Sequence, residues 1–199
     1  EADDVIGYLT NTTLKDSKCT IMSTDKDFLQ LVSPRVNLYS PTKKITYNEE
    51  LVKKEFGVYP KNILTCRTVE GDKSDRIAGV KGVGTKSMVK EFPMLTENEK
   101  FDVKMLIDSA GSKTTRISKM IKDDELVVKR NYILMQLQNP DIPNHTKLKI
   151  TDTVRDNKPQ ITKYKLQRLM VEDKLWGHIP NFDNWITEFM LLQHYWNNK

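Results

Sequence analysis

The first seventy residues alternate between helical and strand-like patterns of apolar positions. Over residues 2–15, Val5, Ile6 and Leu9 fall on one face of a helix whose first turn is acidic, as the helix dipole favours. The apolar run over 18–23 then predicts a buried strand. The chain is therefore predicted to begin with a helix followed by a strand.

Turn and cap residues define the next elements. A proline-containing turn at 40–42 separates two short strands that are predicted over 35–40 and 44–47. Asn48 is a favourable helix N-cap, and Gly57 is a favourable residue just past a helix end. A helix is therefore predicted between these two residues.

The rest of the chain is mostly helical in pattern. Helices are predicted over 62–70, 75–78, 85–92, 161–173 and 181–195, with a glycine turn at 82–84, and the helical pattern after Thr96 is interrupted at 110–112 and 139–143. The predicted fold class is α/β, with a sheet layer over residues 1–71 and a helical half over 72–199.

Length and composition fit a protein with one good core. Of the 199 residues, 38% are hydrophobic and 30% are charged, and no apolar run approaches the roughly 20 residues of a membrane-spanning helix. Cys19 and Cys66 offer neither a disulfide framework nor a Cys-x-x-Cys metal pair. We therefore expect a soluble, cytoplasmic protein with no membrane partner, or one in the host cytoplasm if it is viral.

The basic charge of the chain is unevenly distributed. The formal net charge is +5, which favours a polyanionic partner. Residues 1–71 contain ten basic and ten acidic residues, so the positive excess lies in the later part of the chain. Attraction to a nucleic acid is therefore expected from the helical half.

Seven acidic residues form three tight groups, in the segments EADD, STDKDF and GDKSD. Their members are Glu1, Asp3, Asp4, Asp25, Asp27, Asp72 and Asp75. The second group directly follows a predicted strand and precedes a short helix beginning at Phe28, so it is placed where open α/β sheets hold their ligands. The first and third groups contain acids three residues apart, which a helix would place on one face. The two acids of the second group would point the same way from extended backbone.

This acid pattern predicts a divalent-metal site. Carboxylate oxygens are hard ligands suited to Mg²⁺ or Mn²⁺. Two such ions about 4 Å apart generate hydroxide and stabilise the leaving oxygen in phosphoester hydrolysis. Each group alone has an ordinary structural explanation, as a helix first turn, an N-cap or a turn. Their joint occurrence before a glycine-rich segment favours the metal site.

The glycine-rich segment that follows the third acid group predicts a phosphate contact. Its glycines allow close backbone approach and leave N–H groups bare, and the helix beginning near Thr85 offers further N–H groups. The residues expected to contact DNA are Lys81, Gly82, Val83, Gly84, Thr85, Lys86 and Lys90. Carbonyls of such a hairpin also suit a monovalent cation such as K⁺. The alternative is a simple interhelical turn.

The three segments EADD, STDKDF and GDKSDRIAGVKGVGTK together resemble the 5′-nuclease, or flap endonuclease, family. The later segment over 129–143 is most similar to the bacteriophage ribonuclease H and 5′-3′ exonuclease branch. The resemblance implies a partial PIN-like, Rossmann-like sheet followed by a helix-hairpin-helix motif that grips duplex DNA. It also implies two active-site metal ions held by the seven acids, with Asp3, Asp4, Asp25 and Asp27 nearest the chemistry.

The expected activity is metal-dependent cleavage of phosphodiesters near 5′ ends. The resemblance implies substrates that carry a 5′ flap, a nick or an RNA primer, and partners such as single-strand-binding protein, clamp and polymerase. The family pattern has a strand and a basic arch that would precede Glu1, so we expect this chain to be a fragment. We expect either that a missing segment or a separate chain completes it, or that it is marginally stable on its own. The rivals are a duplex-binding fragment that does not cleave and a PIN-type ribonuclease, which typically lacks the glycine hairpin.

Overall fold

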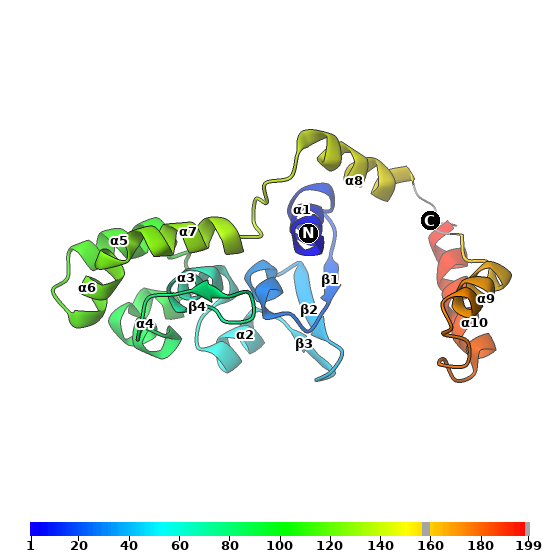
Figure 1. Cartoon of the computed structure of the whole chain (residues 1–199), viewed down its shortest axis with the longest axis horizontal. Helices are drawn as coiled ribbons and strands as arrows, with labels where there is room; N and C mark the ends of the chain where they lie inside the picture. The colour runs from blue at the N-terminus through cyan, green and yellow to red at the C-terminus, as the bar shows by residue number, and fades with distance from the viewer. Residues whose placement is uncertain (157–159, 198–199) are drawn as a thin grey trace. The chain divides into compact units, whose positions relative to one another are not determined.

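The computed structural model describes residues 1–156 and 160–197, which form two compact units, Glu1–Ile150 and Thr151–Lys199 (Figure 1). The first unit contains the sheet and most of the helices, and the second is a small helical unit. The fold is thus α/β with a small sheet, as the sequence predicts. The division at residue 71 lies inside the first unit and remains a functional proposal.

A three-stranded sheet follows the N-terminal helix. Helix α1 (Ala2–Tyr8) continues into the π-helical turn η1 (Leu9–Thr13), and the strands are β1 (Cys19–Met22), β2 (Val36–Ser40) and β3 (Ile45–Tyr47). Strand order is β1-β2-β3, with β1 parallel to β2 and β3 antiparallel to it. Ile21, Leu38 and Tyr47 lie opposite one another in register, and all three are buried.

The expectation that β1 is a buried strand was wrong. Only Ile21 is buried among its four residues, and Met22 is 71% exposed. The reason is that β1 lies at the edge of the described sheet and pairs only with β2. The sequence shows how apolar a strand is, but the position of the strand in the sheet decides how many of its side chains are buried.

Three short helices connect and cover the sheet. The 3-10 helix η2 (Lys26–Leu31) follows β1, and α2 (Glu49–Phe56) and α3 (Pro60–Glu70) follow β3. Asn48 caps α2 by accepting a hydrogen bond from the backbone N–H of Leu51, and Gly57 ends it at a φ of 79°. Both cap predictions are confirmed.

Buried amide side chains fix the elements around α3. Gln30 of η2 donates to the carbonyl oxygen of Met135 and accepts from the N–H of Leu137, both at 2.9 Å. Asn131 of α7 (Glu125–Met135) donates to the carbonyl oxygens of Thr68 and Ala78, each at 2.9 Å. Because these groups are buried, their hydrogen bonds are costly to lose.

A two-stranded hairpin follows α3, formed by β4 (Gly71–Asp72) and β5 (Ile77–Ala78), and α4 (Thr85–Glu91) comes next. The expected helix over 75–78 was therefore wrong. The strands approach so closely that a Cβ on Gly71 would lie 2.5 Å from the carbonyl oxygen of Ile77. Glycine permits this pairing, and the carbonyl of Ala78 is held by Asn131 instead of by a helical turn.

The remaining helices complete the two units. They are η3 (Pro93–Thr96), α5 (Val103–Gly111), α6 (Arg116–Asp123), α7, α8 (Asn144–Asp156), α9 (Lys163–Glu172) and α10 (Phe182–Asn197). The breaks near 111 and 139–143 and the two late helices agree with the sequence pattern. Met170, Phe182 and Ile186 form the small core of the second unit. None of the helices in the described ranges is long and apolar enough to cross a membrane.

Candidate metal centre and nucleic-acid surface

Asp25 and Asp27 stand at the carboxyl end of β1, as the sequence predicts. Asp25 is the N-cap of η2, and its side chain accepts a hydrogen bond of 2.8 Å from the backbone N–H of Asp27. The backbone between them is not extended, because the helix begins at Lys26. The expected common direction, which assumed a strand, therefore does not hold, and Asp27 projects from the first turn of η2.

The β4–β5 hairpin brings the third acid group to the same place. One carboxylate oxygen from each of Asp27, Asp72 and Asp75 lies within 4.8 Å of the other two. Asp72 is oriented by the backbone N–H groups of Ser74, at 2.7 Å, and of Asp75, at 3.4 Å. Residues 45 positions apart in the sequence thus converge because α3 packs against η2 and carries the hairpin.

Arg67 of α3 stands between these acids. Its guanidinium forms ion pairs with both Asp27 and Asp72. Among the described residues, two buried side-chain atoms form no hydrogen bond, namely Nε of Arg67 and Oδ1 of Asp27, which is the oxygen that contacts the guanidinium. An oxygen that is buried, charged and incompletely paired is suited to a cation.

The pKa values of Asp27 and Asp72, the two acids paired with Arg67, are shifted in opposite directions. Burial raises the pKa of Asp27 to about 6, with Arg67 opposing the rise and Asp25, Asp72 and Asp75 adding to it. The pKa of Asp72 is instead lowered, chiefly by its hydrogen bonds from Ser74 and despite its burial. Four negative groups therefore act on one another at this end of the sheet.

The first acid group lies nearby on α1 and contributes unequally. Burial raises the pKa of Asp3, and the negative charge of Asp25 is the largest of the charges that raise it further. Glu1 and Asp4 form the capping box of α1, and the α-ammonium group of Glu1 lies 3.4 Å from a carboxylate oxygen of Asp4. Asp3 is thus the member that links this group to the second one, although the expected i, i+3 face paired Glu1 with Asp4.

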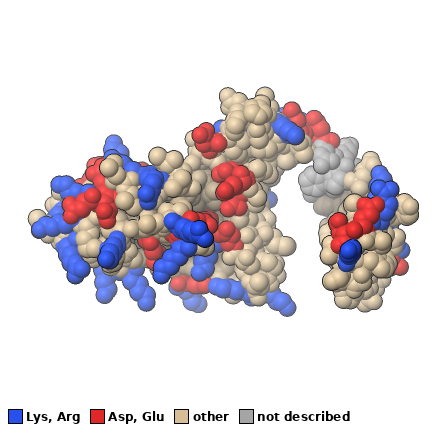
Figure 2. All heavy atoms as spheres, viewed as in Figure 1, with Lys and Arg blue, Asp and Glu red and all other residues tan. Residues whose placement is uncertain are grey.

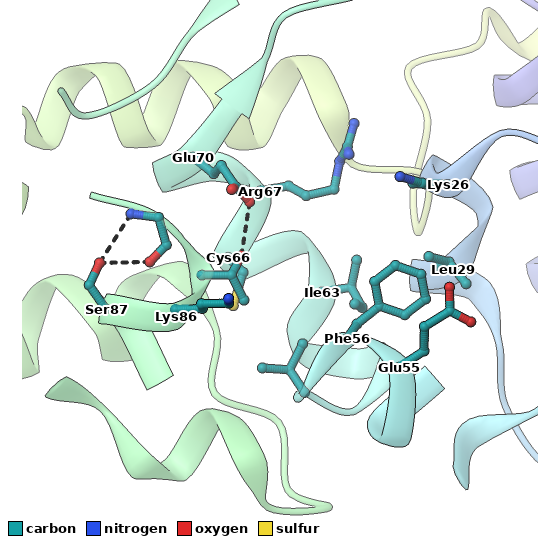
Figure 3. Close-up of a pocket in the computed structure, with 13 residues that line it drawn as sticks. Lys26, Leu29, Glu55, Phe56, Ile63, Cys66, Arg67, Glu70, Lys86 and Ser87 are labelled. Carbon is teal, nitrogen blue, oxygen red and sulfur yellow. Dashed lines mark hydrogen bonds between the residues drawn. The ribbon is translucent and has the colours of Figure 1, made fainter. Parts of the chain in front are cut away.

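A cleft of about 660 Å³ lies beside the acids and is lined by residues of η2, α2, α3 and α4 (Figure 3). Its lining includes the cations Lys26, Arg67 and Lys86, the acids Glu55 and Glu70, and apolar walls. On the face drawn in Figure 2, acidic groups gather over the middle of the first unit, and basic groups spread over the part that carries α4 to α6.

The glycine-rich segment presents lysines more clearly than bare amides. Lys81, Lys86 and Lys90 are exposed, but the side chain of Val83 is only 5% exposed and packs in the core. The N–H of Gly84 is not bare, because it donates to the hydroxyl of Ser87 at 3.1 Å.

The other positions of this segment differ in how they are held. Gly82 is exposed and adopts a φ of 78°, which favours glycine. Thr85 donates its hydroxyl hydrogen to Glu70 at 2.9 Å. Arg67 and Glu70 belong to no recognisable sequence motif, so the sequence did not predict either of them as a site residue. Only the path of α3 places them beside the acids and the hairpin.

Comparison with known proteins shows which families the sequence is similar to. Residues 1–57 match the family described as 5′-3′ exonuclease, N-terminal resolvase-like domain. The chain is 43% identical over 90 residues to a 5′-3′ exonuclease of Aquifex aeolicus (strain VF5), and this match covers 45% of the chain and 31% of that protein. It is 31% identical over 152 residues to flap endonuclease Xni of Shewanella loihica (strain ATCC BAA-1088 / PV-4), covering 74% of the chain and 56% of that protein.

Solved structures share the fold. A T5 5′-exonuclease with bound zinc matches with a TM-score of 0.66 at 22% identity, covering 78% of this chain and 59% of that one. A T5 D15 flap endonuclease in a pseudo-enzyme-product complex with DNA and metal ions matches equally well, with a TM-score of 0.66. The chain spans only part of the length of these proteins. By its matching segment the chain is similar to 5′-3′ exonucleases and flap endonucleases, and it shares the fold of the T5 5′-exonuclease.

Proposed function

We propose that this chain carries the metal-binding and DNA-gripping parts of a divalent-metal-dependent 5′-nuclease that hydrolyses phosphodiesters during DNA replication. The observation that carries the proposal is the convergence of Asp27, Asp72 and Asp75 within 4.8 Å, next to the linked pair Asp3 and Asp25. Carboxylates from segments far apart in the sequence meet at the carboxyl end of β1, which is the end of a strand where α/β folds bind ligands.

The donor set fits a hard divalent cation. All the converging groups are carboxylate oxygens, and Oδ1 of Asp27 is buried beside the guanidinium of Arg67 without forming a hydrogen bond. Mg²⁺ or Mn²⁺ would be held by Asp27, Asp72 and Asp75 on one side and by Asp3 and Asp25 on the other, with Glu1 and Asp4 on the rim. When bound, such ions supply a hydroxide nucleophile and neutralise the scissile phosphate.

The protein's own contribution is the orientation of these oxygens. The N–H of Asp27 holds the carboxylate of Asp25, and two N–H groups of the hairpin hold that of Asp72. Asn131 locks the hairpin to α3 and α7, so the two halves of the acid site keep their spacing. Fixed ligands of this kind lower the cost of ordering the site when cations and substrate bind.

Duplex DNA is proposed to bind along the glycine-rich segment. Lys81, Lys86 and Lys90 are exposed and supply attraction to phosphates without sequence preference. Gly82 lets the duplex backbone approach closely, as in a helix-hairpin-helix motif between α3 and α4. The backbone carbonyls of the glycine-rich segment suit K⁺. On this proposal residues 1–71 supply most of the acids, and residues 72–199 hold a duplex that carries a 5′ flap, a nick or an RNA primer.

Asp25→Asn provides the test of cleavage. On a 5′-flap substrate with Mg²⁺, we expect this variant to lose cleavage and to retain duplex binding, whereas the exposed control Asp123→Asn keeps both. Equal loss of binding and cleavage would contradict the assignment of Asp25. If the chain bound duplex but no variant or condition gave metal-dependent cleavage, the chain would instead be a DNA-gripping segment.

Lys86→Ala tests the hairpin surface. Removing one phosphate contact should weaken duplex binding about equally for all sequences and lower the slope of log affinity against log salt by about 1. Electrophoretic or fluorescence-anisotropy titrations between low and moderate salt measure this slope. An unchanged slope would exclude Lys86 from the DNA interface.

A further inference from the structure

Arg67 occupies the centre of the acid cluster that is proposed to hold a metal ion. Its guanidinium contacts Asp27 and Asp72, which are two of the three acids whose oxygens lie within 4.8 Å of one another. A cation placed among those oxygens would have to share them with the guanidinium. Charge neutralisation of the cluster is thus already partly supplied by the chain itself.

The ion pairs of Arg67 are incomplete in geometry. Its Nε is buried without a hydrogen-bond acceptor, and Oδ1 of Asp27, the oxygen that Nη2 of Arg67 contacts in the ion pair, is buried and forms no hydrogen bond with it. A guanidinium fits a carboxylate best through two parallel hydrogen bonds, and this arrangement does not achieve that. The pairing with Asp27 is therefore one that a better-fitting cation can replace.

The cleft beside the acids gives the Arg67 side chain a second place to lie. Arg67 lines this cleft of about 660 Å³, which also contains the carboxylate of Glu70, one helical turn further along α3. Figure 3 shows the Arg67 side chain extending away from Glu70, toward the side on which Lys26 lies. Arg67 and Glu70 lie three residues apart on α3, a spacing at which helical side chains meet, so a change of rotamer would carry the guanidinium toward Glu70 without moving the backbone.

We propose that Arg67 is a built-in counter-ion of the acid cluster, which a divalent cation displaces into the neighbouring cleft. This inference rests on the proposed function of the cluster. Arg67 then acts as a positioning residue that sets how tightly the Asp27, Asp72 and Asp75 site binds metal. It also keeps the three acids together when no metal is bound, because their mutual repulsion is otherwise uncompensated.

The experiment measures Mn²⁺ binding to the whole 199-residue chain by isothermal titration calorimetry, without DNA. Arg67→Met removes the charge and keeps much of the side-chain volume. We expect it to bind Mn²⁺ at least about tenfold more tightly than the unaltered chain, a change that corresponds to about 1.4 kcal/mol. Arg168→Met removes an arginine from an exposed ion pair with Glu172 and should leave Mn²⁺ binding unchanged.

Thermal unfolding supplies a readout that is independent of activity. In EDTA the Arg67→Met chain should melt below the unaltered chain, and Mn²⁺ should raise its midpoint more than it raises that of the unaltered chain. If Arg67→Met does not fold in either condition, Arg67→Lys decides, because a lysine ammonium pairs with one acid at a time and should still tighten Mn²⁺ binding. Equal or weaker Mn²⁺ binding by the folded variant would overturn the proposal.

Asp75→Asn separates failure of this inference from failure of the proposed function. If Asp75→Asn weakens Mn²⁺ binding but Arg67→Met does not strengthen it, the metal site is real and the counter-ion role is wrong. If Asp75→Asn leaves Mn²⁺ binding unchanged both in the otherwise unaltered chain and in the Arg67→Met chain, the cluster is not a metal site, and both proposals fail.

Discussion

Asp27→Asn should make the metal-free protein more stable, although Asp27 is central to the proposed site. Burial raises the pKa of Asp27 from its ordinary 3.8 to about 6, so the folded state disfavours the ionised form. At about 1.4 kcal/mol for each pH unit, ionising Asp27 costs the folded state up to about 3 kcal/mol. Since its side chain is 17% exposed, solvent reduces this figure, and we expect a gain of about 1–2 kcal/mol at pH 7.5.

The pH dependence gives this prediction its sign. Because the folded-state pKa is raised, the stability that Asp27 contributes is complete below pH 3.8 and is lost as the pH rises through about 6. Asparagine does not titrate, so the advantage of the variant should be largest above pH 6 and should shrink toward pH 4.

Urea unfolding in EDTA at pH 7.5 and at pH 4 measures both values, with the exposed Asp16→Asn as control. A variant that is less stable at pH 7.5, or equally favoured at both pH values, would refute the reasoning that burial sets the pKa of Asp27. In that case the ion pair with Arg67 would outweigh the burial of the charge.

Three further changes test the frame around the site. Asn131→Ala should cost about 2–3 kcal/mol in urea unfolding, because it removes two buried hydrogen bonds to backbone carbonyls of α3 and β5, whereas Asn98→Ala on the surface should cost little. Glu91→Gln should destabilise at pH 7 and not in acid. Although burial opposes it, hydrogen bonds from α6 and its N-cap lower the pKa of Glu91, so its contribution is present above its ordinary 4.5 and lost as the pH falls through the lowered value. A pH series that shows the opposite trend would exclude this role. Gly79→Ala should disrupt the hairpin in circular dichroism and unfolding assays, because its Cβ would lie 2.3 Å from backbone atoms of α3, whereas Gly111→Ala meets open space and should be neutral or mildly stabilising.

Much of the local structure follows from short stretches of sequence. Asn48 and Gly57 specified α2, and the turn at 40–42 separated two strands, because caps and turns act within a few residues. The helix expected over 75–78 failed for the opposite reason. Its residues Ile77 and Ala78 pair with Asp72 and Gly71, and the side chain of Asn131, more than fifty positions away, donates a hydrogen bond to the carbonyl oxygen of Ala78.

The sequence by itself determined which side chains carry the chemistry, since acids and glycines in three ordered groups indicate cations and phosphates wherever they fold. The tertiary structure decided which of them meet. Asp27 joins Asp72 and Asp75 because α3 packs on η2 and delivers the hairpin, and among the charges that raise the pKa of Asp3 that of Asp25 is the largest. It also placed Arg67 among the acids, which no local pattern indicates. Long-range convergence depends on packing between elements, and packing is a property of the whole fold.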